Sequence, residues 1–444
     1  MTSRLVQTVP PEAAERVSLA AGGVGVFEIP GLPAGVLAPA LRRTGFAYLA
    51  VFAMAAVGAG LVRTVTTTYL PLLLADIREA PGLIGLVMMV NSAAGFAVPL
   101  LVGRWSDRRH TARHGRRPFI VGGALLAACG LSAAAVGHGT SFLVLALAGT
   151  VAYVGVNVVT TAHRALVHDC FEGGQYARGN GAQEVAMLIG GLIGLAVGGL
   201  LTTLAPWAPF VLAAVGMPLL AWPTVRWLPV TVPRGRKRGV SPPFRFYAAA
   251  LTRPGVRALL AAEVLWVIGY AALPVFFILY AQRVLNLDAA RASLWLAAFA
   301  VVAGAVMSAA GYVQQPRLHK PFLALGVLLM GTGFLAAGVF TSLLWVSVAC
   351  ALAAVGFGLV STLGFSLFAA LIPRGEAGGY TAIYYSLRAA ASALAVPVAG
   401  VAIASSGSYR SLFLLGGAAT LAALVPLSLS PSPEEGARLT RALP

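Results

Sequence analysis

Hydrophobic residues occur along the chain in blocks long enough to form membrane-spanning helices. A helix rises about 1.5 Å per residue, so about 20 residues cross the roughly 30 Å of bilayer hydrocarbon. The pattern predicts spans at 46–74, 82–103, 119–137, 141–166, 182–204, 207–228, 257–281, 290–311, 321–340, 343–372, 379–404 and 409–429. We therefore expect an all-α polytopic membrane protein with about twelve transmembrane helices.

The spans divide into six before a polar stretch and six after it. This stretch contains VTVPRGRKRGVSPPFR, whose prolines and basic run are typical of a solvated linker. The expected organisation is an N-terminal tail at 1–43, a six-helix bundle at 44–228, a basic linker at 229–256, a second bundle at 257–430 and a C-terminal tail at 431–444. The N-terminal tail lacks the order of regions that a signal peptide needs.

An internal repeat supports two related halves. VGVNVVTT, Val154 to Thr161, aligns with VGFGLVST, Val355 to Thr362, at an offset of 201 residues. RPFIVGGALLA, from Arg117, aligns with KPFLALGVLLM, from Lys320. Two matches in the same order indicate two six-helix pseudo-repeats.

Composition and charge agree with a membrane protein. The 444 residues are 59% hydrophobic and 10% charged, against roughly 25% charged in soluble domains. Of 31 Lys and Arg, 25 lie in the tails and in the loops after the even-numbered spans, which predicts a plasma (cytoplasmic) membrane protein with both termini cytoplasmic. The net charge of +17 is thus spread over short loops, which indicates topology and contact with membrane lipid rather than binding to nucleic acid.

The sequence gives little support for an enzyme. Cys129, Cys170 and Cys350 are far apart and form neither a disulfide framework nor a metal-binding pair. No P-loop, GxSxG or HExxH pattern is present, which argues against an ATP-driven pump or a hydrolase. We expect no cofactor and no metal, a small-molecule substrate, and a monomer.

The loop after the second span carries the most specific motif, GRWSDRRHTARHGRRPFI. Gly103 allows close approach of a neighbouring helix, and Asp107 can face a helix N-terminus while accepting bonds from Arg108 or Arg116. Such a cluster can hold two bundles together in one state and release them in another. The alternative is a solvated basic loop that only sets topology.

This motif resembles the loop motif of major facilitator transporters, in the version found in sucrose–proton symporters and their glycoside relatives. Gly103, Asp107, Arg108, Arg116 and Arg117 are among the matching positions. RALVHD, from Arg164 to Asp169, and ARGNGAQ, from Ala177, are also similar to segments of those symporters. The resemblance implies the major facilitator fold, alternating access, and a conformational latch that includes Arg164 and Asp169.

One position departs from those symporters. They carry a proton-coupling Asp eleven residues before the matching Arg, where this chain has Tyr153, although Asn157 does match. A second resemblance points elsewhere, because drug–proton antiporters of the same superfamily have a glycine motif that matches Gly190, Gly194, Gly198 and Gly199. Small residues at this spacing also serve close helix packing.

Ionisable residues inside the spans are candidates for function, because a mid-bilayer charge costs roughly 2.5 to 3.5 kcal/mol on insertion scales. Arg63 shares a helix face with Thr67, which is typical of a cavity lining. Glu263 is our first choice for an ion-coupling carboxylate and Glu184 our second. The alternative for Glu263 is a permanent ion pair with Arg388, which we expect at similar depth.

Aromatic and polar residues complete the expected site. Trp266 and Tyr270 lie four residues apart on one face, and sugar sites combine such rings with polar groups. In the resembled architecture helices one, four, seven and ten line the cavity, which places Arg63, Thr67, Asn157, Trp266 and Tyr270 there. We expect uptake of a sugar or glycoside by cation symport; the alternatives are proton-coupled efflux of a drug or metabolite and a non-transporting sensor.

Overall fold

A computed structural model describes residues 45–108, 116–171, 176–228, 253–313, 315–372 and 377–431. By its residue contacts the chain separates into the units Met1–Tyr48 and Leu49–Pro444, and the described helices lie in the second unit apart from the first three residues of α3. The helices are α3 (Phe46–Thr68), α4 (Leu70–Ile77), α5 (Pro81–Arg108), α6 (Arg117–Val136), α7 (Phe142–Cys170), α8 (Tyr176–Leu201), α9 (Ala208–Trp227), α11 (Pro254–Ala271), α12 (Leu273–Val284), α13 (Ala289–Ala310), α14 (Pro316–Val339), α15 (Leu343–Ala370), α16 (Ala377–Ser406), α17 (Arg410–Ala422) and α18 (Leu424–Leu429).

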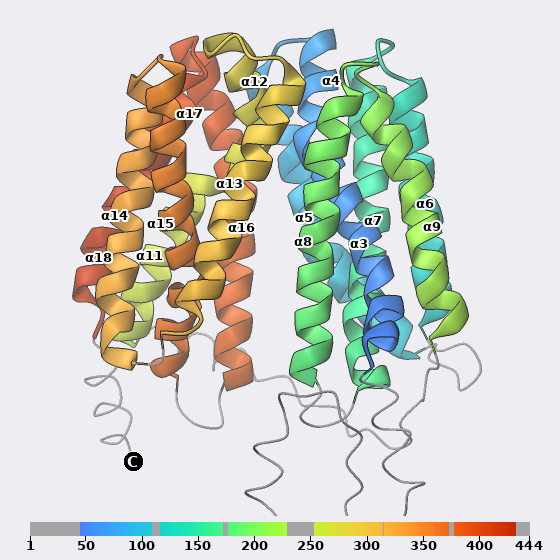
Figure 1. The fold of residues 1–444 in the computed structure, drawn as a ribbon, viewed down its shortest axis with the longest axis horizontal. Helices are drawn as coiled ribbons and strands as arrows, with labels where there is room; N and C mark the ends of the chain where they lie inside the picture. Colours follow the sequence, from blue (N-terminus) through green and yellow to red (C-terminus); the bar gives the residue numbers. More distant parts are fainter. Residues whose placement is uncertain are drawn as a thin grey trace, which may run out of the picture. The chain divides into compact units, whose positions relative to one another are not determined.

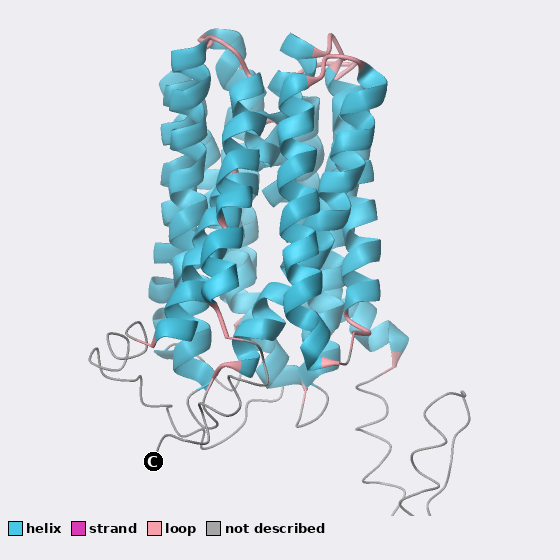
Figure 2. Cartoon of the chain, turned by 90° about the vertical axis from the view of Figure 1, so that its left-hand side faces the viewer, coloured by secondary structure: helices cyan, strands magenta, loops and turns pink. Residues whose placement is uncertain are grey.

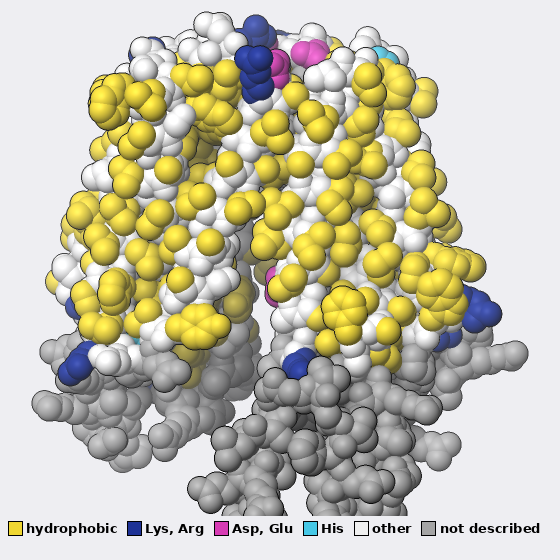
Figure 3. All heavy atoms as spheres, in the orientation of Figure 1, with side chains coloured by type: hydrophobic (Ala, Val, Ile, Leu, Met, Phe, Trp, Pro, Cys, Tyr) yellow, Lys and Arg dark blue, Asp and Glu magenta, His cyan; other side chains and the backbone are white. Residues whose placement is uncertain are grey.

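Twelve helical segments of the described chain are long and apolar enough to cross a membrane, as predicted. The described residues contain helices and short loops but no strand (Figures 1 and 2). Hydrophobic side chains cover the lateral face, and charged side chains gather toward the two ends (Figure 3). This distribution is the one a bilayer requires, because its hydrocarbon cannot solvate charges.

Two spans are broken at equivalent places in the repeat. The first span changes from α3 to α4 at Tyr69, two residues before Pro71, and the seventh changes from α11 to α12 at Ala272, two residues before Pro274. Proline has no N–H to donate, and its ring clashes with the carbonyl four residues earlier. The two breaks lie 203 residues apart in the sequence, which equals the offset between the repeated segments that begin at Arg117 and Lys320.

The two bundles repeat the same internal packing. In the first bundle α6 packs on α7 and α9, and in the second α14 packs on α15 and α17. Arg117 begins α6 and donates to the Leu228 carbonyl at 2.6 Å, next to the end of α9. Lys320, its counterpart near the start of α14, donates to the Ser430 carbonyl at the end of α18. The prediction of two six-helix pseudo-repeats is therefore confirmed.

The bundles contact each other mainly through α5 with α16 and α8 with α13, and α4 also contacts α12. At α5 and α16, a Cβ added at Gly85 would lie 2.8 Å from the backbone of Pro397, and one at Gly400 would collide with Pro81. We call the end of the bundles where α4 stops and α5 begins the loop end. We call the opposite end, where α9 stops and α11 begins, the linker end. Figure 3 shows the surface hollowed between the bundles toward the linker end.

The fifth-span glycines are packing positions. A Cβ added at Gly190 would collide with α3, and one at Gly194 would lie 3.1 Å from Thr64 of α3. Gly198 leaves room for the Tyr69 ring, and Gly199 lies against Ser293 of α13. These glycines let α8 approach α3 within its own bundle and α13 in the other one.

Candidate functional site

The carboxylate of Glu263 is enclosed within the second bundle. Glu263 lies midway along α11, and its side chain has no exposed surface. Arg388 Nη1 donates to Glu263 Oε1 at 2.8 Å, and the Tyr384 hydroxyl donates to Oε2 at 2.5 Å. Tyr384 and Arg388 are four residues apart on α16, so both project from one helix face. Each carboxylate oxygen thus has its own donor, as a buried charge requires.

Aromatic rings surround this ion pair. Arg388 places its guanidinium carbon 5.7 Å from the centroid of the Tyr270 ring, which in turn packs edge-on against Phe357 of α15 at 4.9 Å. A Cβ added at Gly364 of α15 would lie 3.2 Å from the Trp266 ring and 3.7 Å from Glu263 Oε2. The glycine therefore lets α15 approach the cluster closely. Trp266 is completely buried here, so in this conformation it packs inside the bundle instead of lining an open surface.

Arg388 occupies one side of Glu263 and is the partner with exposed surface. The Arg388 side chain is 30% exposed, whereas that of Glu263 is 0% exposed. An ion or a proton that reaches the carboxylate from this side must displace or pass the guanidinium. Breaking a buried ion pair costs several kcal/mol unless a new partner replaces the lost one, so loss of one partner and arrival of the other are coupled.

The predicted cavity residues of the first bundle lie apart from this cluster. Arg63 is exposed on α3, and no described side chain pairs with it. Thr67 is half-buried one turn further along α3. Asn157 of α7 is also half-buried, donates to the Tyr153 carbonyl at 2.8 Å, and lies beside Gly95 of α5. No described hydrogen bond or ion pair joins these residues to Glu263.

Glu184 occupies a very different environment from Glu263. It pairs with Arg164 at 3.5 Å between α8 and α7, and both side chains are more than half exposed. The pair lies at the linker end, where water can solvate both groups. The Glu184 carboxylate is thus in contact with solvent, whereas that of Glu263 is enclosed.

The predicted latch residues are distributed over several contacts of the first bundle. Arg116, just before α6, and Asp169, near the end of α7, form a buried ion pair at 3.0 Å. Arg117 donates instead to a backbone carbonyl of the same bundle. Gly103, Asp107 and Arg108 lie in the last two turns of α5, and their side chains are outside the described residues.

Sequence reasoning missed the polar contacts that join the bundles at the loop end. Glu79, between α4 and α5, accepts two bonds of 3.0 Å from Arg283 of α12 and a third of 3.3 Å from the Tyr409 hydroxyl. Burial and the Glu79 carboxylate raise the pKa of Tyr409, so the phenol stays a donor. The available signal was slight: Glu79 and Arg283 are charged residues expected at the same end of the spans.

A second missed contact joins the bundles beside the break in the first span. The Tyr69 hydroxyl lies 3.0 Å from the Ser293 hydroxyl of α13 and 3.2 Å from each of the Gly194 and Leu195 carbonyls of α8. Tyr69 is completely enclosed, so this polar contact is shielded from water. The proline break places the ring where two bundles and three helices meet.

His163 has a structural environment that sequence reasoning did not foresee. Its Nε2 lies 2.7 Å from the Phe52 carbonyl of α3, and its Nδ1 lies 3.2 Å from Gln183 Oε1 of α8. The buried ring therefore joins three helices of the first bundle. Among the described residues, no group of three or more His, Cys, Asp and Glu side chains could hold a metal ion.

Comparison with known proteins places this geometry in a family. A sequence profile described as "Major Facilitator Superfamily" matches residues 52–396 and 317–443, whereas no curated protein matches in sequence. Among solved structures, the chain is similar to a bacterial homologue of the human lysosomal transporter Spinster in an inward-facing, unoccupied conformation (TM-score 0.67, 16% identity, 89% of this chain and 97% of that one). It is also similar to the peptide transporter POT in complex with sulfate (0.67, 16%, 91% and 99%) and to the human organic anion transporter TETRAN (0.58, 19%, 88% and 99%). These identities show a shared fold, and the profile spans most of the chain: the protein belongs to the Major Facilitator Superfamily.

Proposed function

We propose that this protein is a secondary active transporter that moves a small organic solute by alternating access and couples the movement to a cation at Glu263. One observation carries the proposal: Glu263 is a fully enclosed carboxylate paired with Arg388, whose own side chain is partly exposed. In this cycle the carboxylate alternates between two states, one paired with arginine and one neutralised by a proton or cation. The two states differ in where Arg388 is held.

The expected cycle follows from that exchange. When a cation or proton neutralises Glu263, Arg388 loses its partner and is free to move toward the exposed side. The Tyr270 ring, on which the guanidinium rests, moves with it or contacts the solute in its place. We expect the linker end to face the cytoplasm, because the tails and the loops after the even-numbered spans carry most of the Lys and Arg residues.

The solute we propose first is a sugar or glycoside, taken up by symport. The support is the resemblance of the loop motif and of the Arg164 to Asp169 segment to sucrose–proton symporters. Tyr270 adds an aromatic ring next to a bidentate donor, a combination suited to a sugar with an apolar face and hydroxyl edges. The glycines that resembled an efflux motif lie in helix packing, so they add no support for export.

Arg63 favours a second class of solute, an organic anion. It is an exposed cation within a membrane span and has no described partner. Phe52 of α3 contacts α7, and Gly60 of α3 contacts α8. Arg63 projects from α3 in a direction between these two contacts. A carboxylate or phosphate group on the solute would offset the cost of holding this charge in the membrane.

The test is counterflow and accumulation in proteoliposomes with a panel of labelled neutral sugars, glycosides and sugar acids. Glu263→Gln keeps the shape of the side chain but cannot titrate. It should abolish accumulation driven by an ion gradient and leave solute exchange intact, since exchange needs no net ion movement. Glu184→Gln is the matched control, because it removes a carboxylate that is also paired with arginine but exposed.

The outcomes separate the assignments. Normal accumulation by Glu263→Gln together with loss in Glu184→Gln would move the coupling site to the linker end. If both variants accumulate solute like wild type, the protein does not couple transport to a carboxylate of either pair. No flux of any panel member above that of empty liposomes would favour a sensor built on the transporter fold.

A further inference from the structure

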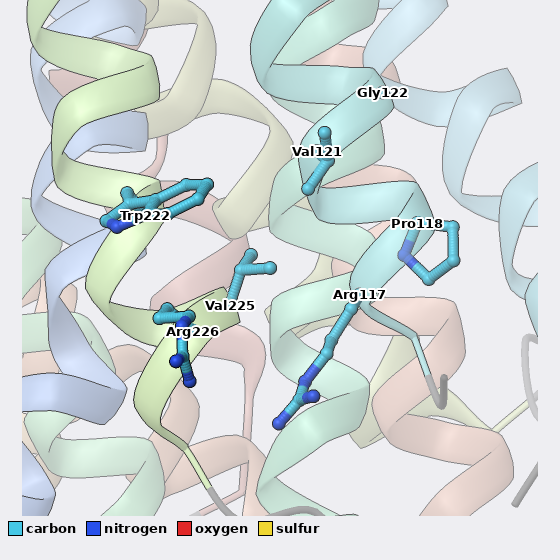
Figure 4. Close-up of a pocket in the computed structure, with 7 residues that line it drawn as sticks. All are labelled: Arg117, Pro118, Val121, Gly122, Trp222, Val225 and Arg226. Carbon is cyan, nitrogen blue, oxygen red and sulfur yellow. The ribbon is translucent and has the colours of Figure 1, made fainter. Parts of the chain in front are cut away.

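A cavity of about 550 Å³ lies on the outer face of the first bundle, between α6 and α9 (Figure 4). Arg117 and Arg226 border it toward the linker end, and their guanidinium groups point the same way. Val121, Gly122 and Trp222 line the part that extends toward the middle of the spans. The cavity therefore has a cationic end and an apolar end on a surface that faces lipid.

The cationic end has unused hydrogen-bond donors. Arg117 is held in place by one bond to the Leu228 carbonyl, while its Nε is buried and has no hydrogen-bond partner among the described residues. Arg226, in the last turn of α9, is exposed, and no described carboxylate lies within ion-pair distance of it. Two guanidinium groups with free donors and no acid between them favour an anion, and most of all a phosphate.

The apolar end is shaped by a missing side chain. A Cβ added at Gly122 would meet no atom within 4 Å, so the groove is open at this position. Trp222 stands 60% exposed beside it, so more than half of this large residue is not covered by protein. An alkyl chain in this groove would cover both residues and gain the contacts that the protein does not supply.

The second bundle provides a natural comparison, because its α14 and α17–α18 pack as α6 and α9 do. Lys320 there corresponds to Arg117 and makes the same type of bond to a backbone carbonyl. At the position of Gly122, however, the second bundle has Leu325. Two residues before the acceptor carbonyl, where the first bundle has Arg226 before Leu228, the second has Ser428 before Ser430. Both features of the cavity, the open groove and the second cation, are thus particular to the first bundle and are not required by the fold.

We propose that this cavity binds an anionic phospholipid. The headgroup phosphate lies between Arg117 and Arg226, and one acyl chain follows the groove past Gly122 and Trp222. Basic pockets between transmembrane helices are suited to anionic headgroups, and each cation near the membrane surface strengthens such binding by roughly five-fold. The site is separate from the Glu263 cluster, so the proposal does not depend on the transported solute.

The test is native mass spectrometry of the detergent-purified full chain during titration with phosphatidylglycerol. Arg226→Gln should weaken the tightest lipid adduct by roughly five-fold, and Gly122→Leu should weaken it without any change in charge. Arg317→Gln is the matched control, since Arg317 is an exposed arginine of the second bundle, near the start of α14. The double variant Leu325→Gly/Ser428→Arg should create a second tight adduct in the other bundle.

Titrations with phosphatidylcholine and with inorganic phosphate show whether the site recognises an anionic lipid or a free anion. The proposal requires phosphatidylglycerol to bind more tightly than either, and thermal unfolding curves of each variant show that it is folded. Wild-type binding by both Arg226→Gln and Gly122→Leu would overturn it. Equal weakening by Arg317→Gln would also overturn it, because the effect would then be one of net charge. Displacement of the lipid by inorganic phosphate at similar concentration would show an anion site that does not recognise lipid.

Discussion

The ion pair between Glu79 and Arg283 should stabilise the conformation in which the bundles meet at the loop end. It joins residues 204 positions apart in different bundles, so separation of the bundles at this end must break it. Glu79→Gln removes the charge and keeps the shape. We expect a larger fraction of molecules in which the two bundles are apart at the loop end, and this fraction is directly measurable.

The magnitude follows from the exposure of the pair. The side chains of Arg283 and Glu79 are 56% and 43% exposed, so water screens much of their attraction. Exposed pairs contribute roughly 0.2 to 1 kcal/mol, and the two-pronged geometry with the Tyr409 hydroxyl places this one near the upper value. A loss of about 1 kcal/mol shifts a two-state equilibrium by about five-fold.

The assay is electron–electron double resonance between spin labels at Thr140 and Thr341 in a cysteine-free background. These positions lie in the loop before α7 and the loop before α15, one in each bundle. Glu79→Gln should increase the long-distance population by about five-fold. Because the pKa of Tyr409 is raised above its ordinary value of 10.0, the distribution in the wild type should not change from neutral pH to about pH 9.

Two further variants make the result decisive. Arg291→Gln breaks an exposed pair with Asp288 at the start of α13, within one bundle. It should therefore leave the distances between the spin labels unchanged. Arg283→Gln combined with Glu79→Gln should add nothing beyond either single change. Distances like those of the wild type in Glu79→Gln, or an equal shift in Arg291→Gln, would refute the role of the pair.

Two other predictions concern stability. Asp169→Asn removes the charge from one side of the buried Arg116–Asp169 ion pair, so it should lower the free energy of unfolding by roughly 3 to 5 kcal/mol, measured by thermal or chemical unfolding in detergent. An effect below about 1 kcal/mol, typical of exposed pairs, would contradict the buried assignment. Gly130→Ala should lower the unfolding temperature because its Cβ would collide with α7, whereas Gly122→Ala should not; equal effects would mean that α6 and α7 tolerate a wider spacing.

The fold could be predicted from the sequence because each span is specified locally. Every transmembrane helix satisfies its own backbone hydrogen bonds, so a block of apolar residues is enough to define it. The sixth span was expected at 207–228 and is α9, Ala208–Trp227. The breaks at Tyr69 and Ala272 were missed, although Pro71 and Pro274 were visible, because both spans remain apolar throughout.

The candidate site was only partly predictable, since its contacts join distant helices. The similar depth of Glu263 and Arg388 followed from helix counting, and the structure places them 2.8 Å apart. Tyr384 could have been added, because it lies one turn before Arg388 on the same face. Nothing local could indicate that Arg116 pairs with Asp169 or that Tyr69 reaches Ser293, because helix packing alone decides which faces meet.

Helix α16 takes part both in the Glu263 cluster and in the contact between the two bundles. Its first half carries Tyr384 and Arg388, which hold Glu263, and its second half packs against α5 of the other bundle at Pro397 and Gly400. Arg388 and Pro397 are nine residues apart, a rise of about 13.5 Å along one helix. In the proposed cycle, release of Arg388 therefore acts on the same helix that joins the bundles at the loop end. In the proposed mechanism, a cation at Glu263 thus shifts the balance between the bundles although the site lies wholly within one of them.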